Sequence, residues 1–260
     1  MKTAKLISIL LILSMFFPVF RAAAEEGERR FETEVNYWDA ALDGKVRINE
    51  TGITGTEIDL VNDIGLDEEK GIPEYVFSLR FSERNQFHLS YFSADYSGSK
   101  LLTKNITYKG QNFAASTNVS GSLEMTIVDA HYGYSLVKDE TLEIQPCLGV
   151  KYAGIESSLS STAVGSISEE IKGAVPVIGL RVKADLGDRL IAGIDVSGVA
   201  VDIDDIDGSL IDLRASLRYN FSGSMSTAIG YRLFDIDVDS EGDTGDVTID
   251  GPFVSVNGIF

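Results

Sequence analysis

The sequence contains very few residues that crosslink a fold or bind a metal ion. Its 260 residues include one cysteine, Cys147, and two histidines. A lone cysteine excludes a framework of intramolecular disulfides, so packing and hydrogen bonding must hold the fold together. It also excludes a lipid-anchored lipoprotein, because no thiol follows the N-terminal cleavage site described below. We expect Cys147 to act as a small space-filling residue.

Basic residues are also scarce. The chain has 22 Lys and Arg against 40 Asp and Glu, which gives a formal net charge of −18 at pH 7. A chain this acidic repels nucleic acids, so we exclude nucleic acid as a partner.

Long apolar runs are absent except for one near the N-terminus, Leu6 to Phe20. Lys2 and Lys5 precede this run, and Ala22 and Ala24 follow it in the spacing that a signal peptidase reads. At about fifteen residues the run is short for a membrane span, which leaves a retained anchor helix as the less favoured alternative. We therefore predict a cleaved signal peptide over residues 1–24 and no transmembrane helix after it.

The mature chain, residues 25–260, alternates between apolar and polar residues over long stretches. Every second residue is apolar in 142–152, 174–186 and 211–221. This period of two is typical of a β-strand with one apolar face, and the runs are about twice the usual strand length of five or six residues. The pattern predicts ten strands, at 31–47, 74–82, 86–98, 121–137, 141–156, 172–186, 189–203, 209–221, 225–238 and 248–260.

The connections between these strands alternate in length. Short polar links are predicted around 82–85, 138–140, 187–188 and 222–224, and longer ones at 48–73, 99–120, 157–171, 204–208 and 239–247. An antiparallel meander with one tightly turned rim has this arrangement. No linker or break in composition divides the chain, which predicts a single domain over 25–260. Because 48–73 could contain further strands, eight or twelve strands remain alternatives to ten.

Three features indicate that the apolar faces point outward, into lipid. The strands match the roughly 9–11 residues that cross a bilayer when tilted. Aromatic residues lie near the ends of the apolar faces, as at membrane interfaces. The alternation also continues to the final residue, Phe260, as expected of a strand whose backbone must pair to close a barrel in lipid. The predicted fold is all-β, an antiparallel up-and-down transmembrane β-barrel.

The C-terminal residues carry a resemblance to a known family. Phe260, with Val256 and Val254 at alternate positions before it and Gly258 as a weaker match, resembles the terminal strand of the small outer-membrane β-barrel proteins of Gram-negative bacteria, the OmpA/OmpX/OmpW type. The resemblance implies location in the outer membrane and recognition of these residues by the barrel-assembly machinery. It also implies that both termini and the short links face the periplasm and that the long links face outside.

The polar faces would then line the lumen. They form a predicted network of charged and polar side chains: Arg80, Asp129, His131, Glu143, Lys151, Arg181, Asp195, Asp212, Arg214, Arg218 and Arg232. With Lys183 and Asp185 added, this set is slightly basic. Side chains fill a barrel of eight to ten strands, so a salt-bridged plug is favoured over a narrow channel.

Neither histidine provides a convincing catalytic pattern. His88 and Ser90 resemble the His-x-Ser pair of outer-membrane lipid A deacylases, but Tyr91 and Phe92 replace the residues expected next. An omptin-like protease would need its Asp–His pair at the outer rim, whereas Asp129 and His131 are predicted to face the lumen. We predict that the protein is not an enzyme and has no catalytic residues.

Two functions remain open. The first is a structural or surface-interaction barrel, and the second is a barrel that transports small solutes or apolar ligands. The expected partners are outer-membrane lipid, lipopolysaccharide and, during biogenesis, the barrel-assembly machinery. A monomer is expected.

The acidic residues cluster near the long links. No cofactor is predicted, but two clusters could weakly gather Ca²⁺ or Mg²⁺ and bridge the rim to lipopolysaccharide phosphates. The residues of this cation hypothesis are Asp202, Asp204, Asp207, Asp237, Asp239 and Asp243. They lack the ligand spacing of an EF-hand, and a solvated acidic rim is the alternative.

Overall fold

The structure is a computed structural model that describes residues 30–203, 206–240 and 242–260. The predicted signal peptide and Asp204 lie outside these residues. Within the described ranges, no helix is long and apolar enough to cross a membrane.

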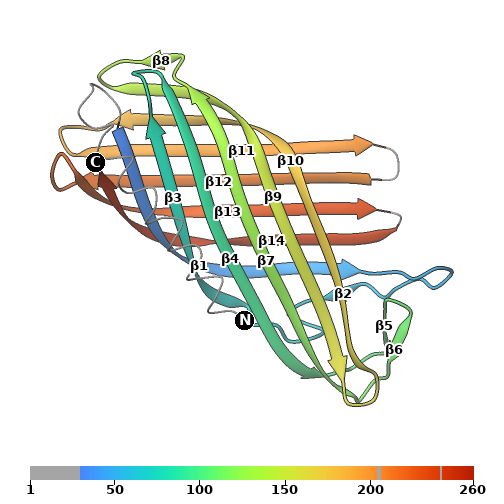
Figure 1. Cartoon of the computed structure of the whole chain (residues 1–260). Helices are drawn as coiled ribbons and strands as arrows, with labels where there is room; N and C mark the ends of the chain where they lie inside the picture. Colours follow the sequence, from blue (N-terminus) through green and yellow to red (C-terminus); the bar gives the residue numbers. More distant parts are fainter. Residues whose placement is uncertain (1–29, 204–205, 241) are drawn as a thin grey trace, which may run out of the picture.

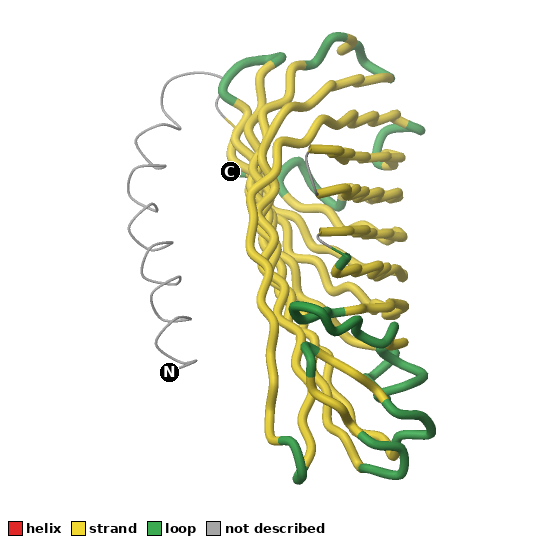
Figure 2. Tube along the Cα trace, turned by 90° about the vertical axis from the view of Figure 1, so that its right-hand side faces the viewer, coloured by secondary structure: helices red, strands yellow, loops and turns green. Residues whose placement is uncertain are grey.

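Ten long strands form the fold, and each pairs antiparallel with its neighbours in chain order (Figures 1 and 2). They are β1 (Arg30–Arg47), β3 (Glu69–Arg80), β4 (Asn85–Leu101), β7 (Asn118–Tyr134), β9 (Leu142–Ser161), β10 (Gly165–Asp185), β11 (Leu190–Ile203), β12 (Ile206–Asn220), β13 (Met225–Ser240) and β14 (Asp243–Ile259). Four short strands lie in the connections: β2 (Ile58–Asp59), β5 (Ile106–Tyr108), β6 (Gln111–Phe113) and β8 (Val137–Lys138).

The last strand closes the barrel against the first. β14 pairs with both β13 and β1, and Val256 lies opposite Val35. At the end of this seam, Phe31 and Phe260 exchange two backbone hydrogen bonds of 3.1 and 2.8 Å. The seam therefore leaves no free edge, as lipid requires. The predicted antiparallel barrel of ten strands is confirmed.

One end of the barrel, here called the turned end, has short turns. The Ser82 hydroxyl accepts a hydrogen bond from the Asn85 N–H (3.2 Å), and the Asp139 carboxylate accepts from the N–H groups of Thr141 (2.8 Å) and Leu142 (2.9 Å). The hydrogen bonds from Thr141 and Leu142 to the charged form lower the pKa of Asp139. These turns lie where the sequence predicts short links.

At the opposite end, here called the hairpin end, the long links predicted at 48–73 and 99–120 are present, but those predicted at 157–171 and 239–247 were wrong. β9 runs to Ser161 and β10 starts at Gly165, within the predicted link 157–171. Similarly, β13 and β14 occupy most of 239–247. These stretches have polar residues on the face where the membrane strands have apolar ones, which made them look like loops.

The polarity of the strands inverts along their length. On β1 the inward side chains change from Glu34 and Asn36 to Trp38 and Leu42, all of which are buried. The outward side chains change in the opposite sense, from apolar Val35 and Tyr37 to Asp39 and Asp43. The barrel is thus apolar outside at the turned end, as in lipid, and apolar inside at the hairpin end, as in water.

The outward apolar band has aromatic residues at both edges. Its exposed members include Leu148, Ile178 and Val254. The exposed aromatic residues beside the hairpin end are Tyr37, Tyr75, Tyr152 and Tyr231, and those beside the turned end are Phe81, Phe87, Tyr132, Tyr134, Tyr219, Phe221 and Phe260. Two such girdles are typical of a transmembrane barrel, because amphipathic rings favour the two interfaces.

Two connections fold back and pack against the barrel at the hairpin end. Residues 48–68 bury Ile58, Leu60, Ile64 and Leu66 in the apolar core, and residues 102–117 bury Ile106, Tyr108 and Phe113. In the first connection, desolvation raises the pKa of Asp59, but hydrogen bonds from the N–H groups of Asn62 (2.7 Å) and Val61 (3.1 Å) outweigh it and lower that pKa overall. These connections make the hairpin end a packed core rather than an open mouth.

Two pairs of strands separate toward the hairpin end. β3 pairs with β4 only over Glu74–Arg80, and β10 pairs with β11 only over Ile178–Asp185. The first connection fills the β3/β4 gap, because Leu66 forms a β-bridge with Gly98 and the Asp67 N–H donates to the Ser97 carbonyl (3.1 Å). The β10/β11 gap, visible at the right of Figure 1, is called the β10/β11 fork below.

Shortening the side chain of the terminal residue should impair closure of the barrel. We expect Phe260→Ala to leave export intact but to reduce barrel assembly, because it removes the exposed aromatic side chain at the seam. The measurement is the heat-modifiable fraction on a gel of isolated membranes. A wild-type fraction would contradict this expectation.

Substitution of Gly98 should loosen the hairpin end. A Cβ on Gly98 would lie 1.7 Å from the Gly65 carbonyl oxygen, so Gly98→Ala must displace the connection that fills the β3/β4 gap. We expect a loss of about 1–3 kcal/mol in the free energy of unfolding, measured by urea titration of the refolded barrel. Gly173→Ala is the matched control, because no atom lies within 4 Å of its added Cβ. Equal midpoints for the two variants would refute this account of the gap.

Candidate functional site

Arg232 occupies the centre of the lumen. Its guanidinium donates to the Asp212 carboxylate at 3.0 Å from Nε and 2.9 Å from Nη2, and its Nη1 forms an ion pair with Glu74 (2.9 Å). The central carbon Cζ of the same guanidinium lies 4.9 Å from the centre of the Trp38 ring and 4.7 Å from the centre of the Phe92 ring. Arg232 therefore joins the charged lumen to the apolar hairpin end through cation–π contacts.

The ion pairs continue on both sides of Arg232. The fully buried Lys151 Nζ lies 2.5 Å from Asp212 and 3.2 Å from Asp129, and Asp129 lies 3.2 Å from His131 Nδ1. Asp212 thus bridges Lys151 and Arg232. This arrangement gives each buried charge an opposite charge, which is the condition for keeping it ionised in a low dielectric.

Two arginines of β12 bind the acids of β1 and β3. Arg214 contacts Glu34 and, at 3.6 Å, Glu74, while Arg218 contacts Glu32 and, at 2.9 Å, Glu34. Glu34 also accepts a hydrogen bond from Asn257 Nδ2 (3.0 Å), so β12, β1 and β14 are tied together through the lumen.

The lumen also contains Glu32, Glu34 and Glu74, which are not among the lumen residues predicted from sequence. With them, the described lumen contains seven basic and seven acidic side chains, so the expectation of a slightly basic lumen was wrong. Asp185 lies exposed at the turned end. The signal was present, because Glu32 and Glu34 alternate with Val35 and Tyr37 in the same period of two.

The turned end opens into a vestibule of about 330 Å³. In its wall, Arg80 binds Glu143 through two hydrogen bonds of 2.9 and 3.2 Å, and Ser135 donates to the same carboxylate (2.5 Å). Lys183 and Arg218 also line this space.

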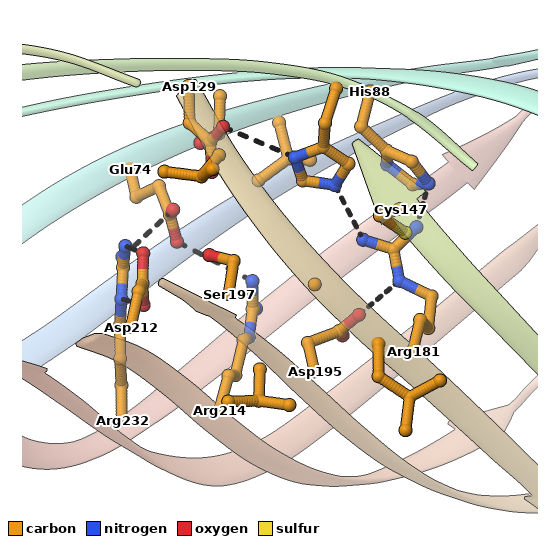
Figure 3. A pocket seen from close by; sticks show the side chains of 17 residues that line it. Glu74, His88, Asp129, Cys147, Arg181, Asp195, Ser197, Asp212, Arg214 and Arg232 are labelled. Carbon is orange, nitrogen blue, oxygen red and sulfur yellow. Dashed lines mark hydrogen bonds and ion pairs between the residues drawn. The ribbon is translucent and has the colours of Figure 1, made fainter. Parts of the chain in front are cut away.

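A second cavity of about 70 Å³ lies deeper, beside the two histidines (Figure 3). The His88 and His131 rings are 5.3 Å apart, and the Arg181 guanidinium contacts both rings and Asp195. His88 Nδ1 lies 2.7 Å from the Ser78 hydroxyl, and half-buried Cys147 lines the same cavity. Both histidines are therefore held in the network by Arg181. A cavity of this volume holds only a few water molecules.

The five described aspartates of the cation hypothesis lie along neighbouring strands and do not form a compact site. Asp202 pairs with Asp207 across β11 and β12, Asp207 pairs with Asp239 across β12 and β13, and Asp237 pairs with Asp246. Asp243 instead accepts a hydrogen bond from the Asn49 N–H (2.7 Å). Among the described residues, no group of three or more His, Cys, Asp or Glu could hold a metal ion. Weak cation binding along this row stays a prediction.

The residues of the assembly signal face outward. Val254, Val256 and Phe260 are exposed by 54%, 58% and 73%, and Gly258 lies beneath the Phe260 ring. Recognition of these residues by the barrel-assembly machinery stays a prediction.

Comparisons with known proteins agree with the fold. No protein-family model matches the chain, and a comparison with curated proteins finds no match. Among solved structures, the chain is similar to the outer-membrane protease OmpT from Escherichia coli, with a TM-score of 0.60 and 8% identity over 89% of this chain and 97% of that one. The attachment invasion locus protein Ail of Yersinia pestis aligns over 90% and 99% of the two chains at 12% identity, with a TM-score of only 0.37. The chain therefore has the antiparallel β-barrel fold of this outer-membrane structure.

Removal of the central arginine should destabilise the barrel. Arg232→Met leaves Glu74 and Asp212 short of their main buried partner, so we expect a loss of about 3–5 kcal/mol in the free energy of unfolding. Lys172→Met is the control, because it removes an ion pair to Glu170 in which both side chains are about half exposed, worth about 0–1 kcal/mol. Urea unfolding of the refolded barrel measures both. Equal losses would mean that the buried lumen network contributes no more to the free energy of unfolding than a half-exposed ion pair does.

Proposed function

We propose that this protein is a surface-interaction barrel of the outer membrane, a closed transmembrane anchor that carries a rigid acidic extension. The observation that supports this function best is the filled interior. Ion pairs centred on Arg232 occupy the lumen at membrane level, and the apolar layer of Trp38, Phe92 and Phe234 lies directly beyond them.

The hairpin-end extension supports an outward-facing role. It consists of residues 38–72, 93–127, 153–173, 199–203, 206–210, 235–240 and 242–250, which carry twenty-two acidic and seven basic side chains. The lumen is balanced in charge, so the excess of acids lies in this extension. Its own apolar core, with Leu60, Leu66 and Phe113, keeps it ordered without lipid.

The same features bear on partners and location. The aromatic girdles and the predicted signal peptide support location in the outer membrane, with the turned end in the periplasm and the extension outside. The acidic extension would approach lipopolysaccharide phosphates only with divalent cations between them, because like charges repel within a Debye length of about 8–10 Å.

Transport and catalysis are less well supported. Beyond the vestibule, the cavities lined by the network residues have volumes of about 60 and 70 Å³, each enough for only a few water molecules. The E. coli structure is titled a protease, but a likeness at 8% identity concerns the fold alone. The Asp129–His131 pair lies in the lumen network instead of at the outer rim.

Conductance tests this proposal. In planar bilayers the refolded wild-type barrel should show no channel steps, because side chains fill its interior. A quadruple variant, Trp38→Ala/Phe92→Ala/Phe234→Ala/Arg232→Ala, removes the apolar layer and its ion-pair hub and should produce steps. Regular steps from the wild type would overturn the closed barrel and favour solute transport.

A further inference from the structure

The β10/β11 fork exposes a free strand edge. β10 pairs with β9 from Gly165 to Ala184, but it pairs with β11 only from Ile178 onward. Residues Gly165–Val177 therefore have a strand on one side only. Most of them are exposed, including the inward-facing Ile171 at 51%.

The backbone of this edge is available for pairing. Neighbouring residues of a strand direct their N–H and C=O groups to opposite sides, so about half of these groups point away from β9. In the described part of the chain, the only hydrogen bond to this segment from beyond the β9–β10 hairpin comes from Lys109 Nζ, at 3.4 Å from the Ser168 carbonyl and at Glu169. A free edge of this length is a template for another strand.

The β3/β4 gap shows how such an edge is occupied in this fold. There, the protein's own residues Leu66 and Asp67 lie along the free edge of β4 and bond to Gly98 and Ser97. Between β1 and β3 the pairing stops at Ala41, and β2 of the first connection pairs with Lys45 and Val46 on the remaining edge of β1. The other pairs of neighbouring long strands within the described residues stay paired to their hairpin end or nearly so. The β10/β11 fork is the place where a strand from another molecule can be added.

We infer that the free edge of β10 binds an extended cationic peptide by strand addition. The inward side of the edge carries the apolar residues Ile167, Ile171 and Val175, together with Glu169, whose charge is paired with Lys109. This side therefore favours apolar residues at every second position of the partner. The acids nearby are Glu156 on β9 and the facing pair Asp202 and Asp207 on the other arm of the fork.

These acids set the charge of the partner. Glu169 and Glu170 are already paired with Lys109 and Lys172, which leaves the fork with an excess of negative charge. Basic side chains at the alternate positions of the partner would balance it. The inference rests on the proposed surface-interaction function and names the class of partner for it.

The probe is a synthetic twelve-residue peptide in which lysine alternates with valine or threonine. Its binding to the refolded full-length barrel in detergent is measured by fluorescence anisotropy, and the contact is located by hydrogen exchange. We expect saturable binding and slowed exchange of amides within 166–177. A peptide of equal charge with proline at every second apolar position cannot pair as a strand and should bind at least about tenfold more weakly.

Two variants separate edge binding from general electrostatics. Ile171→Lys changes the net charge by one unit at the edge and should weaken binding about tenfold, which corresponds to about 1.4 kcal/mol. Asp43→Asn makes the same change of one unit on the outward face of β1, away from the fork, and should alter the Kd by less than about twofold.

Several outcomes would overturn the inference: no binding, equal affinity for the proline peptide, equal weakening by the two variants, or protection confined to strands other than β10. The failure of the proposed function is a separate observation. Channel steps from the wild type would refute the closed barrel but would leave the Kd and the exchange pattern at 166–177 unchanged.

Discussion

Backbone pairing in lipid is the constraint on which the rest of this structure depends. At membrane level each unpaired N–H or C=O costs several kcal/mol, so ten strands must form a continuous ring. β14 meets this requirement by pairing with β1 down to the reciprocal bonds between Phe31 and Phe260. The two gaps in the ring occur only toward the hairpin end. The β10/β11 fork begins beside Pro176, a residue that has no N–H to leave unpaired.

Closure of a ten-stranded ring creates an interior that must be filled, and the two halves fill it differently. At membrane level the outward face is apolar, so the inward face carries the polar residues. These residues can be charged only if each buried charge is paired with an opposite charge. Arg232, Asp212 and Glu74 satisfy this condition at the centre. Beyond Trp38 the solvent changes from lipid to water and the two faces exchange their polarity.

The fold could be predicted from sequence because the signals for it are local. The alternation of apolar and polar residues indicates where the strands lie, and the length of the strands indicates that they cross a membrane. The apolar alternation up to Phe260 indicates that the last strand closes the barrel. Alternation also selected lumen residues such as Lys151 and Asp212, which the structure places in one network. Their partners on β1 and β3, Glu34 and Glu74, follow the same alternation and could have been predicted as lumen residues in the same way.

Other features depend on relations between strands and were not predictable in this way. A period of two does not change when the apolar face turns from outside to inside, so the inversion near Trp38 left no break in the pattern. The length of the β9–β10 hairpin was underestimated because its outward residues, such as Ser158 and Glu170, are polar. The fork depends on the register between β10 and β11, which neither strand specifies alone.

The inversion of polarity and the balance of charge together explain where this protein can interact. A neutral lumen within an apolar belt gives the membrane part no long-range field, so the field of the molecule originates in the extension. That field attracts cations and basic segments from a distance but cannot order them. The free edge of β10 supplies the directional part of recognition, because backbone hydrogen bonds fix the orientation and register of an added strand. Acidic charge and an open edge therefore act at different ranges on the same class of partner.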